Sequence, residues 1–386
     1  MSQMSPKKIL ITGANGFVGS AAVEHFLSRG YRVRALVRVM RDYFPPHPLL
    51  EVVRGDMRDL QSLIRAARGM DAVVHLAAVK SDERESYEIN VGGAERLLRA
   101  CRHNHIRLIV HLSTISVKLF RKGVYGATKH AAEKIFAQGD IPLVTLRSSI
   151  IYGDDLAGVF GRLVRMARRA VIPVIGTGAV TYAPIYVADV ASALEISVRN
   201  PRCHGNQYDI GGPDRITFND LVQKIRFSFY HKPDARLMHV PIPIAFGIAR
   251  ILGLFSARPF LTMSNVHGSA QDVPVDCASF FRDFGFVPRP FAQGLRGLAR
   301  GTDSGLDEVR ILLGYVMRGI GIFVPPTRVE CDFFAAACTS NHLQIAPASL
   351  VATKPRLLGP MDALSKIFYP DSHLQKKLSL ATALVE

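Results

Sequence analysis

Cysteine is scarce in this sequence of 386 residues. The five cysteines are odd in number and widely spaced, and no two of them form a Cys-x-x-Cys pair. Neither a disulfide framework nor a zinc site is therefore indicated, and a reducing compartment fits best. The 13 histidines show no His-Glu-x-x-His pattern, so we expect no metal site.

Long apolar runs are also missing. No stretch of about 18 uncharged apolar residues, the length that crosses a bilayer, is present. No apolar signal region precedes the first candidate strand at Ile9, so we expect a cytoplasmic protein. The shorter apolar runs 241–255 and 311–324 each contain one charge. They fit buried helices, interfacial helices on the inner face of a membrane, or the wall of a lipophilic pocket.

Acidic residues are the minority. Forty-eight Lys and Arg against 32 Asp and Glu give a net charge of +16, whereas the last 86 residues contain eight of each kind, so the whole excess lies in 1–300. The basic residues are scattered, without interleaved aromatics or a DNA-reading motif, so we expect no nucleic-acid partner. A solvated basic surface, an anionic membrane surface and an anionic cofactor remain as explanations.

What the sequence does contain is an alternation of short apolar runs and amphipathic helices, in a chain that is 48% hydrophobic. The expected strands are 9–12, 33–37, 51–54, 72–76, 108–112 and 143–146, and the expected helices are 17–28, 60–67, 90–102 and 125–137. This alternation predicts an α/β fold with a doubly wound parallel Rossmann sheet. Such sheets bind ligands at the carboxyl ends of their strands.

The pattern divides the chain into three parts. Residues 1–170 form the expected nucleotide-binding Rossmann domain. Residues 171–300, where the alternation is less regular and a helix is expected at 217–225, form a smaller substrate lobe whose strands can cross back to the sheet. Residues 301–386 form an appended segment with scattered prolines and an expected helix at 372–385, and its role is unknown.

A glycine-rich turn follows the first strand. The chain runs from Lys8–Ile11 into Thr12-Gly13-Ala14-Asn15-Gly16-Phe17-Val18-Gly19 and then into a helix. Gly13 permits the tight turn, Gly16 lets the backbone approach a pyrophosphate, and Gly19 lets helix and strand pack closely. The free N–H groups and positive dipole end of the helix then favour a phosphate.

The residue after the second strand selects the cofactor. An acidic residue there would accept hydrogen bonds from a free ribose hydroxyl, but Arg38 occupies the position and Arg41 follows. Because guanidinium binds a 2′-phosphate, we expect NADP(H) rather than NAD(H), unless Arg38 is only a solvated charge. Asp56, after the third strand, either accepts from the adenine amino group or caps the helix that begins near Leu60.

A second motif lies at the start of the helix 125–137. Tyr125 and Lys129 are four residues apart and project from one helix face, and Thr114 ends the preceding strand. A phenol has an ordinary pKa of about 10, and a nearby ammonium favours its ionised form. We therefore expect Tyr125 to act as acid or base toward a carbonyl or carbinol that Thr114 orients, with Lys129 holding the cofactor ribose.

From Lys8 to Arg300 the sequence resembles the extended short-chain dehydrogenase/reductase superfamily. The run from Asp71 to Ala78 looks like its fourth strand, and Asn90-Val91-x-Gly93 like its next helix. The resemblance implies that Asn90 joins the catalytic set of Thr114, Tyr125 and Lys129. The expected cofactor-binding residues are Gly13, Asn15, Gly16, Phe17, Val18, Gly19, Arg38, Asp56, Met57, Leu76, Ala77, Ala78, Tyr125 and Lys129.

The chain departs from the superfamily pattern near this motif. Ser148 replaces the usual proline, Val117-Lys118-Leu119 replaces Val-Tyr-Gly, and only 11 positions separate Thr114 from Tyr125. The short spacing argues against a nucleotide-sugar substrate. This short spacing, the stretch 181–187 and the run Gly211-Gly212-Pro213 most resemble a subgroup of the superfamily that contains the nucleotide-binding accessory subunit of respiratory complex I.

Two functions are thus open. The first is an NADP(H)-dependent oxidoreductase for a lipophilic alcohol or ketone, a class that the apolar runs suggest. The second is an accessory or assembly protein that holds NADPH without turnover and docks to a membrane or a membrane complex through 241–255 and 301–386. The Thr114, Tyr125 and Lys129 set favours the first function, and the C-terminal segment favours the second.

Overall fold

The computed structural model describes residues 7–41, 43–80, 83–154, 158–255 and 263–298, which belong to one compact unit, 1–300. The expectations for 301–386, including the apolar run 311–324 and the final helix, lie outside the described residues.

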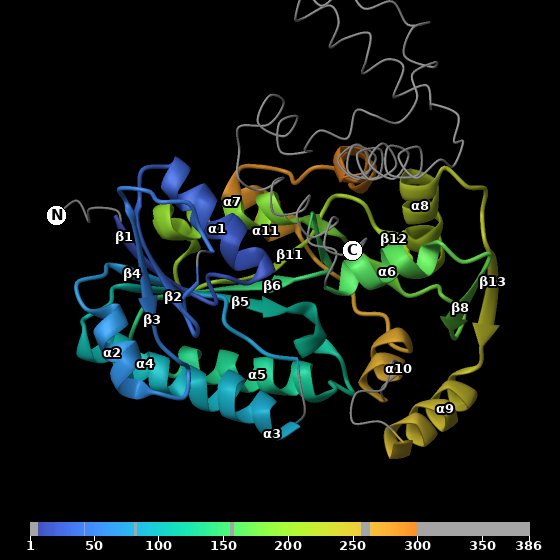
Figure 1. The fold of residues 1–386 in the computed structure, drawn as a ribbon, viewed down its shortest axis with the longest axis horizontal. Helices are drawn as coiled ribbons and strands as arrows, with labels where there is room; N and C mark the ends of the chain where they lie inside the picture. Colours follow the sequence, from blue (N-terminus) through green and yellow to red (C-terminus); the bar gives the residue numbers. More distant parts are fainter. Residues whose placement is uncertain (1–6, 42, 81–82, 155–157, 256–262, 299–386) are drawn as a thin grey trace, which may run out of the picture. The chain divides into compact units, whose positions relative to one another are not determined.

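A seven-stranded sheet organises this unit (Figure 1). Its strands are β1 (Lys8–Thr12), β2 (Arg32–Val37), β3 (Leu50–Arg54), β4 (Ala72–His75), β5 (Leu108–Thr114), β6 (Leu143–Ser148) and β11 (Gln207–Ile210). They are ordered β11-β6-β5-β4-β1-β2-β3, and every neighbouring pair is parallel. The predicted doubly wound Rossmann sheet is confirmed, and its strand order reverses between β1 and β4.

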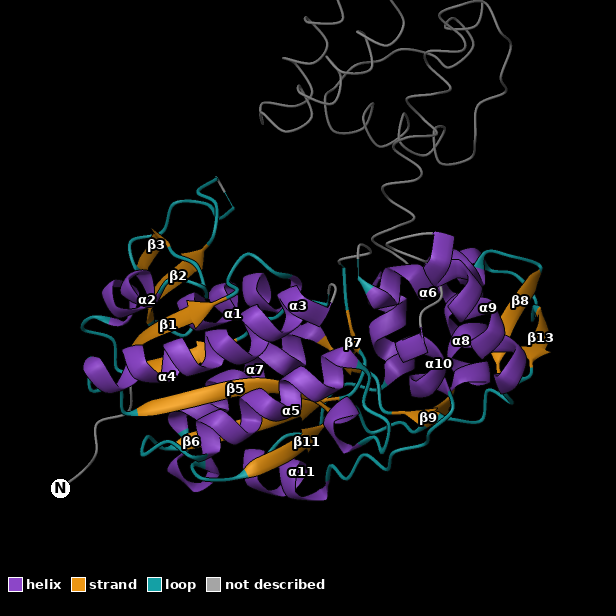
Figure 2. Ribbon diagram, turned by 90° about the horizontal axis from the view of Figure 1, so that it is seen from below, coloured by secondary structure: helices purple, strands orange, loops and turns teal. Residues whose placement is uncertain are grey.

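Helices cover both faces of the sheet (Figure 2). One face packs against α1 (Phe17–Ser28) and α7 (Val187–Arg199), and the other against α2 (Leu60–Ala67), α4 (Gly93–His103) and α5 (Val124–Ala137). Because side chains alternate along a strand, Ile9 and Ile11 join the first core whereas Leu10 joins the second. The apolar strands are buried on both faces for this reason.

The expected helix 90–102 has an irregular start. A short α3 (Glu83–Ser86) leads into η1 (Tyr87–Gly92), a π-helical turn, and α4 begins only at Gly93. Single π turns inside helices occur frequently at functional sites. Here the turn carries Asn90, one of the expected catalytic residues, which is buried.

A smaller lobe lies beyond β6 in the chain. Its elements are β7 (Ile151–Tyr152), α6 (Val159–Ala167), β8 (Val171–Ile175), β9 (Thr181–Tyr182), β10 (Ile185–Tyr186), β12 (Ile216–Thr217), α8 (Phe218–Tyr230), β13 (Arg236–Val240), α9 (Ile242–Phe255) and α10 (Met263–Ser269). A separate core fills this lobe, with α6 and α8 packed together. Thr217 caps α8 by accepting from the Asp220 N–H at 3.1 Å.

The chain returns to the main sheet from this lobe. The edge strand β11 pairs with β6, α7 packs on α1, and α11 (Ala278–Phe284) packs on β11. Residues 171–300 therefore contribute to both the lobe and the Rossmann sheet. Arg289 joins them further, since its guanidinium donates to the buried Asp189 of α7 at 2.9 to 3.2 Å and lies 4.3 Å from the centre of the Tyr186 ring.

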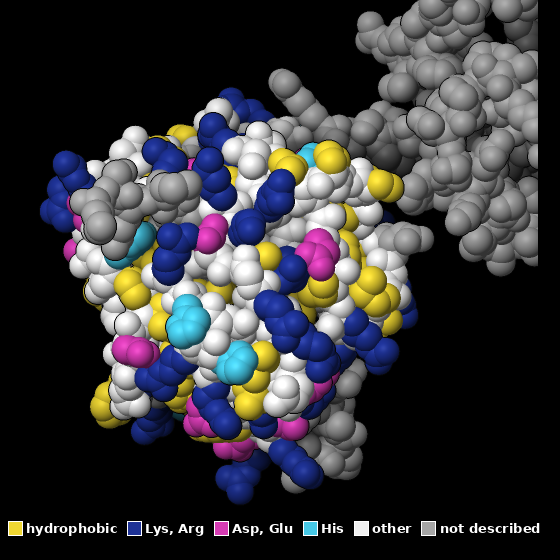
Figure 3. All heavy atoms as spheres, turned by 90° about the vertical axis from the view of Figure 1, so that its left-hand side faces the viewer, with side chains coloured by type: hydrophobic (Ala, Val, Ile, Leu, Met, Phe, Trp, Pro, Cys, Tyr) yellow, Lys and Arg dark blue, Asp and Glu magenta, His cyan; other side chains and the backbone are white. Residues whose placement is uncertain are grey.

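The positive charge is spread over the surface at the amino ends of the strands, where Lys and Arg side chains alternate with acidic and apolar ones (Figure 3). A shallow hollow of about 450 Å³ lies at this end and is lined in part by Lys8, Arg32 and Arg68. It is on the opposite edge from the glycine turn. Among the described residues, none of the helices is long and apolar enough to cross a membrane.

Candidate nucleotide and catalytic site

The glycine turn after β1 is shaped by backbone packing. Gly13 has φ of +68°, and a Cβ added there would lie 2.7 Å from the Ala77 backbone nitrogen. A Cβ on Gly19 would lie 2.0 Å from the Gly13 carbonyl oxygen. The turn and the first turn of α1 thus leave no space for side chains at these two positions, in agreement with the roles that the sequence suggests.

The amino end of α1 is open to a ligand. Gly16 is its N-cap residue, no described side chain caps the helix, and its first turn contains no acidic residue. A Cβ on Gly16 would meet only the Gly13 oxygen, at 3.2 Å. Backbone N–H groups at such a terminus, together with the helix dipole, are a general binding site for phosphate. The cradle therefore fits a dinucleotide pyrophosphate.

The glycine turn faces a pocket of about 230 Å³. From the expected set it brings together Gly13, Asn15, Gly16, Arg38, Asp56, Met57, Leu76, Ala77 and Ala78. It also includes Leu36, Gly55, Val79 and Ile89, which sequence reasoning missed although each of them is next to an expected residue or to the end of a strand. The other members of the expected set do not line this pocket: Phe17, Val18, Gly19, Tyr125 and Lys129. The pocket lies where the strand order reverses, as expected for a Rossmann sheet.

Arg38 immediately follows β2 and is exposed at the pocket. It forms no ion pair with any described residue, so its guanidinium is available to an anion. The Asp56 carboxylate is already engaged, since its Oδ1 accepts from the Arg58 N–H at 2.9 Å and its Oδ2 lies 3.6 Å from the Arg58 guanidinium. The pocket thus presents one unpaired cation and one neutralised acid beside β2 and β3.

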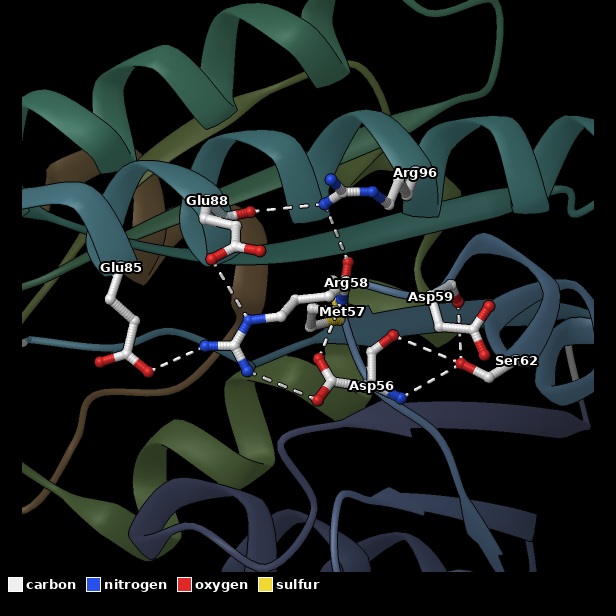
Figure 4. Close-up of polar contacts among 8 residues, drawn as sticks. All are labelled: Asp56, Met57, Arg58, Asp59, Ser62, Glu85, Glu88 and Arg96. Atoms are coloured by element: carbon white, nitrogen blue, oxygen red, sulfur yellow. Dashed lines mark hydrogen bonds and ion pairs between the residues drawn. The ribbon is translucent and has the colours of Figure 1, made fainter.

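Arg58 links the pocket to the helix that carries Asn90 (Figure 4). Besides Asp56, it pairs with Glu85 at 2.9 Å and with Glu88 at 3.4 Å. The helix α2 is capped by Asp59, which accepts from the Gln61 N–H at 2.9 Å. The reading of Asp56 as the helix cap is therefore wrong, because the cap lies three residues later.

Two further sets of contacts lie near the glycine turn, one made by Phe17 and one between β1 and the end of β4. The Phe17 ring and Val187 lie so close to Gly153 that an added Cβ there would be 2.9 Å and 2.6 Å from them. The Thr12 hydroxyl accepts from the Ala77 N–H at 3.3 Å and contacts the buried His75 Nδ1 at 2.7 Å. These contacts fix the edge of the sheet that forms the pocket.

Thr114, Tyr125 and Lys129 lie at the adjoining end of β5 and the start of α5. The Thr114 hydroxyl donates to Ser116 Oγ at 3.2 Å and accepts from the Ser116 N–H at 3.3 Å. The Lys129 ammonium is almost fully buried and donates to the Leu112 carbonyl at 2.6 Å. The i, i+4 spacing holds as expected, with Tyr125 in the first turn of the helix.

The protonation of these groups differs from the expectation. Burial raises the pKa of Tyr125 to about 12. The pKa of Lys129 is lowered to about 7, mainly by burial; Glu133 opposes this fall and Lys80 adds to it. The expected lowering of the Tyr125 pKa by Lys129 is absent in this structure, because the ammonium is directed to a backbone carbonyl of β5.

Asn90 is held by protein groups. Its Oδ1 accepts from the Val79 N–H at 2.9 Å, and its Nδ2 donates to the Val79 carbonyl at 3.0 Å and to Thr128 Oγ1 at 3.1 Å. Thr128 immediately precedes Lys129. Asn90 thus joins the pocket segment after β4 to the helix of Tyr125 and Lys129.

The departures from the superfamily pattern have local partners. The Ser148 hydroxyl donates to the Ser113 carbonyl at 3.1 Å, a bond that proline could not make. Lys118 forms an ion pair with the buried Asp209 of β11. In the short connection to Tyr125, the Arg121 N–H donates to Gln271 Oε1 at 3.1 Å, and Gln271 Nε2 donates to the Arg121 carbonyl at 3.2 Å. The smaller lobe therefore holds this connection in place.

A parallel Rossmann sheet with a glycine turn at its switch point, together with a threonine, tyrosine and lysine at the next strand end, defines the class of NAD(P)-dependent oxidoreductases and epimerases. The sequence model of the NAD dependent epimerase/dehydratase family matches residues 9–211. The chain belongs to this family, whose members are extended short-chain dehydrogenases/reductases.

Relatives with assigned activities include both lipid and sugar enzymes. The 2-alkyl-3-oxoalkanoate reductase of Stenotrophomonas maltophilia is 29% identical over 75% of this chain and 98% of its own length. The ceramide reductase of Caulobacter vibrioides is 30% identical over 61% of this chain and 74% of its own. The UDP-glucose 4-epimerase of Thermotoga maritima shares the fold, with a TM-score of 0.61, 18% identity, and coverage of 78% of this chain and 99% of that one.

Proposed function

We propose that the protein is an NADP(H)-dependent oxidoreductase that transfers hydride to or from a lipophilic alcohol or ketone. The proposal is supported by Tyr125 and Lys129 lying one helix turn apart at the start of α5, with Thr114 at the end of β5. The centre of the Tyr125 ring lies 4.2 Å from Nζ of Lys80, which follows the pocket residue Val79. Two relatives with lipid-type names, the oxoalkanoate and ceramide reductases, support the substrate class.

Tyr125 is the proposed acid in the reducing direction. Because burial raises its pKa to about 12, the phenol keeps its proton at neutral pH and can donate it to a carbonyl oxygen. The bound nicotinamide would supply the hydride. Thr114 is the proposed hydrogen-bond donor to the same oxygen, in place of its present bond to Ser116 Oγ. Lys129 is the proposed contact for the cofactor ribose, and the Leu112 carbonyl and Asn90 hold this helix turn in place.

Arg38 is the proposed contact for the 2′-phosphate of NADPH. It is exposed at the pocket and has no acidic partner among the described residues. In Arg38→Glu, we expect the Kd for NADPH to rise at least about tenfold, the effect of one lost charge-assisted contact, while the Kd for NADH changes less. Fluorescence titration measures both. Arg29→Glu makes the same charge change at the far end of α1 and should bind NADPH like wild type. Equal NADPH affinity of wild type and Arg38→Glu would contradict the assignment.

Turnover separates the oxidoreductase from an accessory protein that only holds NADPH. Tyr125→Phe keeps the ring and removes the proton, so we expect kcat to fall by about 100-fold or more while NADPH binding is retained. Oxidation of the bound cofactor by medium-chain ketones, followed by absorbance, measures this. Tight NADPH binding without turnover in wild type would favour the accessory function.

The helix α9 is the proposed contact with a membrane surface. Three of its isoleucines, Ile244, Ile248 and Ile251, are spaced at helical intervals and are 55%, 40% and 57% exposed. An exposed apolar stripe on a basic protein is typical of interfacial helices. We expect Ile248→Glu to reduce sedimentation with anionic lipid vesicles, whereas Val287→Glu, another exposed apolar position, leaves it unchanged. Equal sedimentation of all three proteins would refute this contact.

A further inference from the structure

Two adjacent residues of the π turn η1 face different parts of the site. Ile89 lines the nucleotide pocket. Asn90 Nδ2 donates to Thr128 Oγ1 of α5 at 3.1 Å, and the Thr128 hydroxyl in turn donates to the Tyr125 carbonyl at 3.1 Å. Any movement of η1 therefore changes the wall of the pocket and the support of the Tyr125 helix turn together.

The preceding residue, Glu88, is held by Arg58 (Figure 4). Arg58 Nε lies 3.4 Å from a Glu88 carboxylate oxygen, and Arg58 Nη2 donates to Glu85 of α3 at 2.9 Å. The Arg58 backbone is fixed just after β3, since its N–H donates at 2.9 Å to Asp56, which lines the pocket. One guanidinium therefore connects the β3 side of the pocket with its helical side.

The charges around Arg58 give this connection a direction. The three carboxylates of Asp56, Glu85 and Glu88 surround one guanidinium, and the four side chains are between 32% and 45% exposed. An isolated exposed ion pair contributes little to stability, whereas a cation shared by several acids contributes more. Without Arg58, Asp56 would repel the two acids on the helical side. The π turn would then move away from β3.

Other contacts hold the same junction without Arg58. Gly93, which begins α4, packs so closely on Met57 that an added Cβ would lie 3.0 Å from the Met57 Cβ. Arg96 Nη1 donates to the Met57 carbonyl at 3.3 Å and to the Glu88 carbonyl at 3.4 Å. A variant without Arg58 should therefore fold, with the π turn displaced rather than lost.

We propose that Arg58 is a positioning residue. Through Glu88 it sets the position of Asn90, and through Asn90 that of the Tyr125 helix turn relative to the nucleotide pocket. Arg58 acts at a distance and needs no contact with the substrate or the nicotinamide. Its effect on turnover rests on the proposed function, whereas its effect on Asn90 exists without turnover.

Two backbone N–H groups in one segment report the effect. The Val79 N–H donates to Asn90 Oδ1 at 2.9 Å, whereas the Ala77 N–H donates to Thr12 Oγ1 at 3.3 Å. Hydrogen exchange at single residues, measured by NMR on full-length protein with NADPH, compares the two. In Arg58→Met we expect exchange at Val79 to become about tenfold faster while exchange at Ala77 stays within about twofold of wild type.

Two further variants check the route of the effect. Glu88→Gln removes the acid on η1 and should speed exchange at Val79 as Arg58→Met does. In Asn90→Ala the Val79 N–H has lost its acceptor, so adding Arg58→Met should not speed its exchange further. A further acceleration in this double variant would mean that Arg58 does not act through Asn90.

Arg65→Met is the matched control. It removes a more exposed cation of α2, which lies 4.0 Å from Asp59, and should exchange like wild type at Val79. Unchanged exchange at Val79 in Arg58→Met, or equal acceleration at Val79 and Ala77, would overturn the positioning role.

Turnover of 2-decanone with NADPH separates this inference from the proposed function. In Arg58→Met we expect kcat to fall about tenfold while KM for NADPH stays within about threefold of wild type. A raised KM with unchanged kcat would make Arg58 a cofactor contact and overturn the positioning role. Faster exchange confined to Val79, in a protein whose wild type shows no turnover, supports the positioning of Asn90 while contradicting the oxidoreductase.

Discussion

The glycine-turn pocket and the region of Tyr125 and Lys129 both lie at the carboxyl edge of one sheet, but they are built by different means. In the pocket, backbone packing at Gly13 and Gly19 fixes the turn, and Asp56 already has its Arg58 partner. Beside Tyr125, Lys80 and Lys129 are placed in surroundings that lower their pKa values. The first region is complete in its packing, whereas the second holds excess positive charge.

The two regions should therefore respond to different kinds of substitution. In the glycine turn, where the backbone is closely packed, a single added methyl group should lower the free energy of unfolding. A charge-defined region should respond to pH and to the removal of a partner. The following variants test the contrast in order of expected size.

The largest effect is expected for Gly19→Ala. The added Cβ would lie 2.0 Å from the Gly13 oxygen and 2.7 Å from the Ala14 oxygen, so the helix or the turn must move. We expect a loss of about 3 kcal/mol in the free energy of unfolding, measured by urea denaturation. Gly247→Ala in α9, where an added Cβ meets nothing within 4 Å, is the control and should not destabilise. Similar stability of both variants would break the contrast.

Glu133→Gln should come next. Glu133 is 4% exposed and binds Arg147 through both carboxylate oxygens, so its removal leaves a partly buried guanidinium without its partner. We expect a loss of about 2 kcal/mol, and also a lower pKa of Lys129 because Glu133 raises it. Arg102→Gln breaks a solvent-exposed pair with Asp140 and should cost far less. Unfolding curves compare them, and equal losses would contradict the assigned role of burial.

Lys129→Met tests the pH dependence. The folded-state pKa of Lys129, about 7, lies below the ordinary value of 10.5, so the unfolded chain binds more protons between these values. The penalty for burying the ammonium is full below pH 7 and fades as pH rises. Wild type should therefore gain stability relative to Lys129→Met between pH 7 and 10, seen as a Tm difference that changes by a few degrees. A Tm difference independent of pH would place the Lys129 pKa near its ordinary value.

The smallest effect is expected for Gln271→Ala. Its side chain makes two hydrogen bonds to the Arg121 backbone, both exposed, so the stability should change by less than about 1 kcal/mol. Because this contact positions the connection between Thr114 and Tyr125, we expect a larger change in KM than in kcat. Steady-state kinetics measure both values; a fall in kcat alone would place Gln271 in another role.

The sequence was informative where the structure is local. The glycine turn and the Tyr125–Lys129 spacing were predictable because each depends on a few adjacent residues and on the periodicity of strands and helices. Six of the seven strands of the sheet followed from their apolar runs for the same reason. The position of Arg38 after β2 followed from the end of that run.

Contacts between distant segments were not predictable. Nothing in the sequence near Lys80 indicates that it lies over Tyr125, 45 positions later, because the β4 and α5 segments meet only in the folded sheet. The return of β11 to the sheet follows a lobe without clear periodicity. The cap of α2 at Asp59 was missed since Asp56 carries the same side chain three residues earlier.

The central claim is that Tyr125 supports hydride transfer rather than nucleotide binding alone. The most direct test supplies NADPH deuterated at the transferable position of the nicotinamide, together with a medium-chain 3-oxo acid, and measures deuterium in the alcohol product by mass spectrometry. The account predicts that wild type forms deuterated product and that Tyr125→Phe forms at most about 1% as much while it still binds NADPH. Equal deuterium transfer by both proteins, or none by wild type, would contradict it.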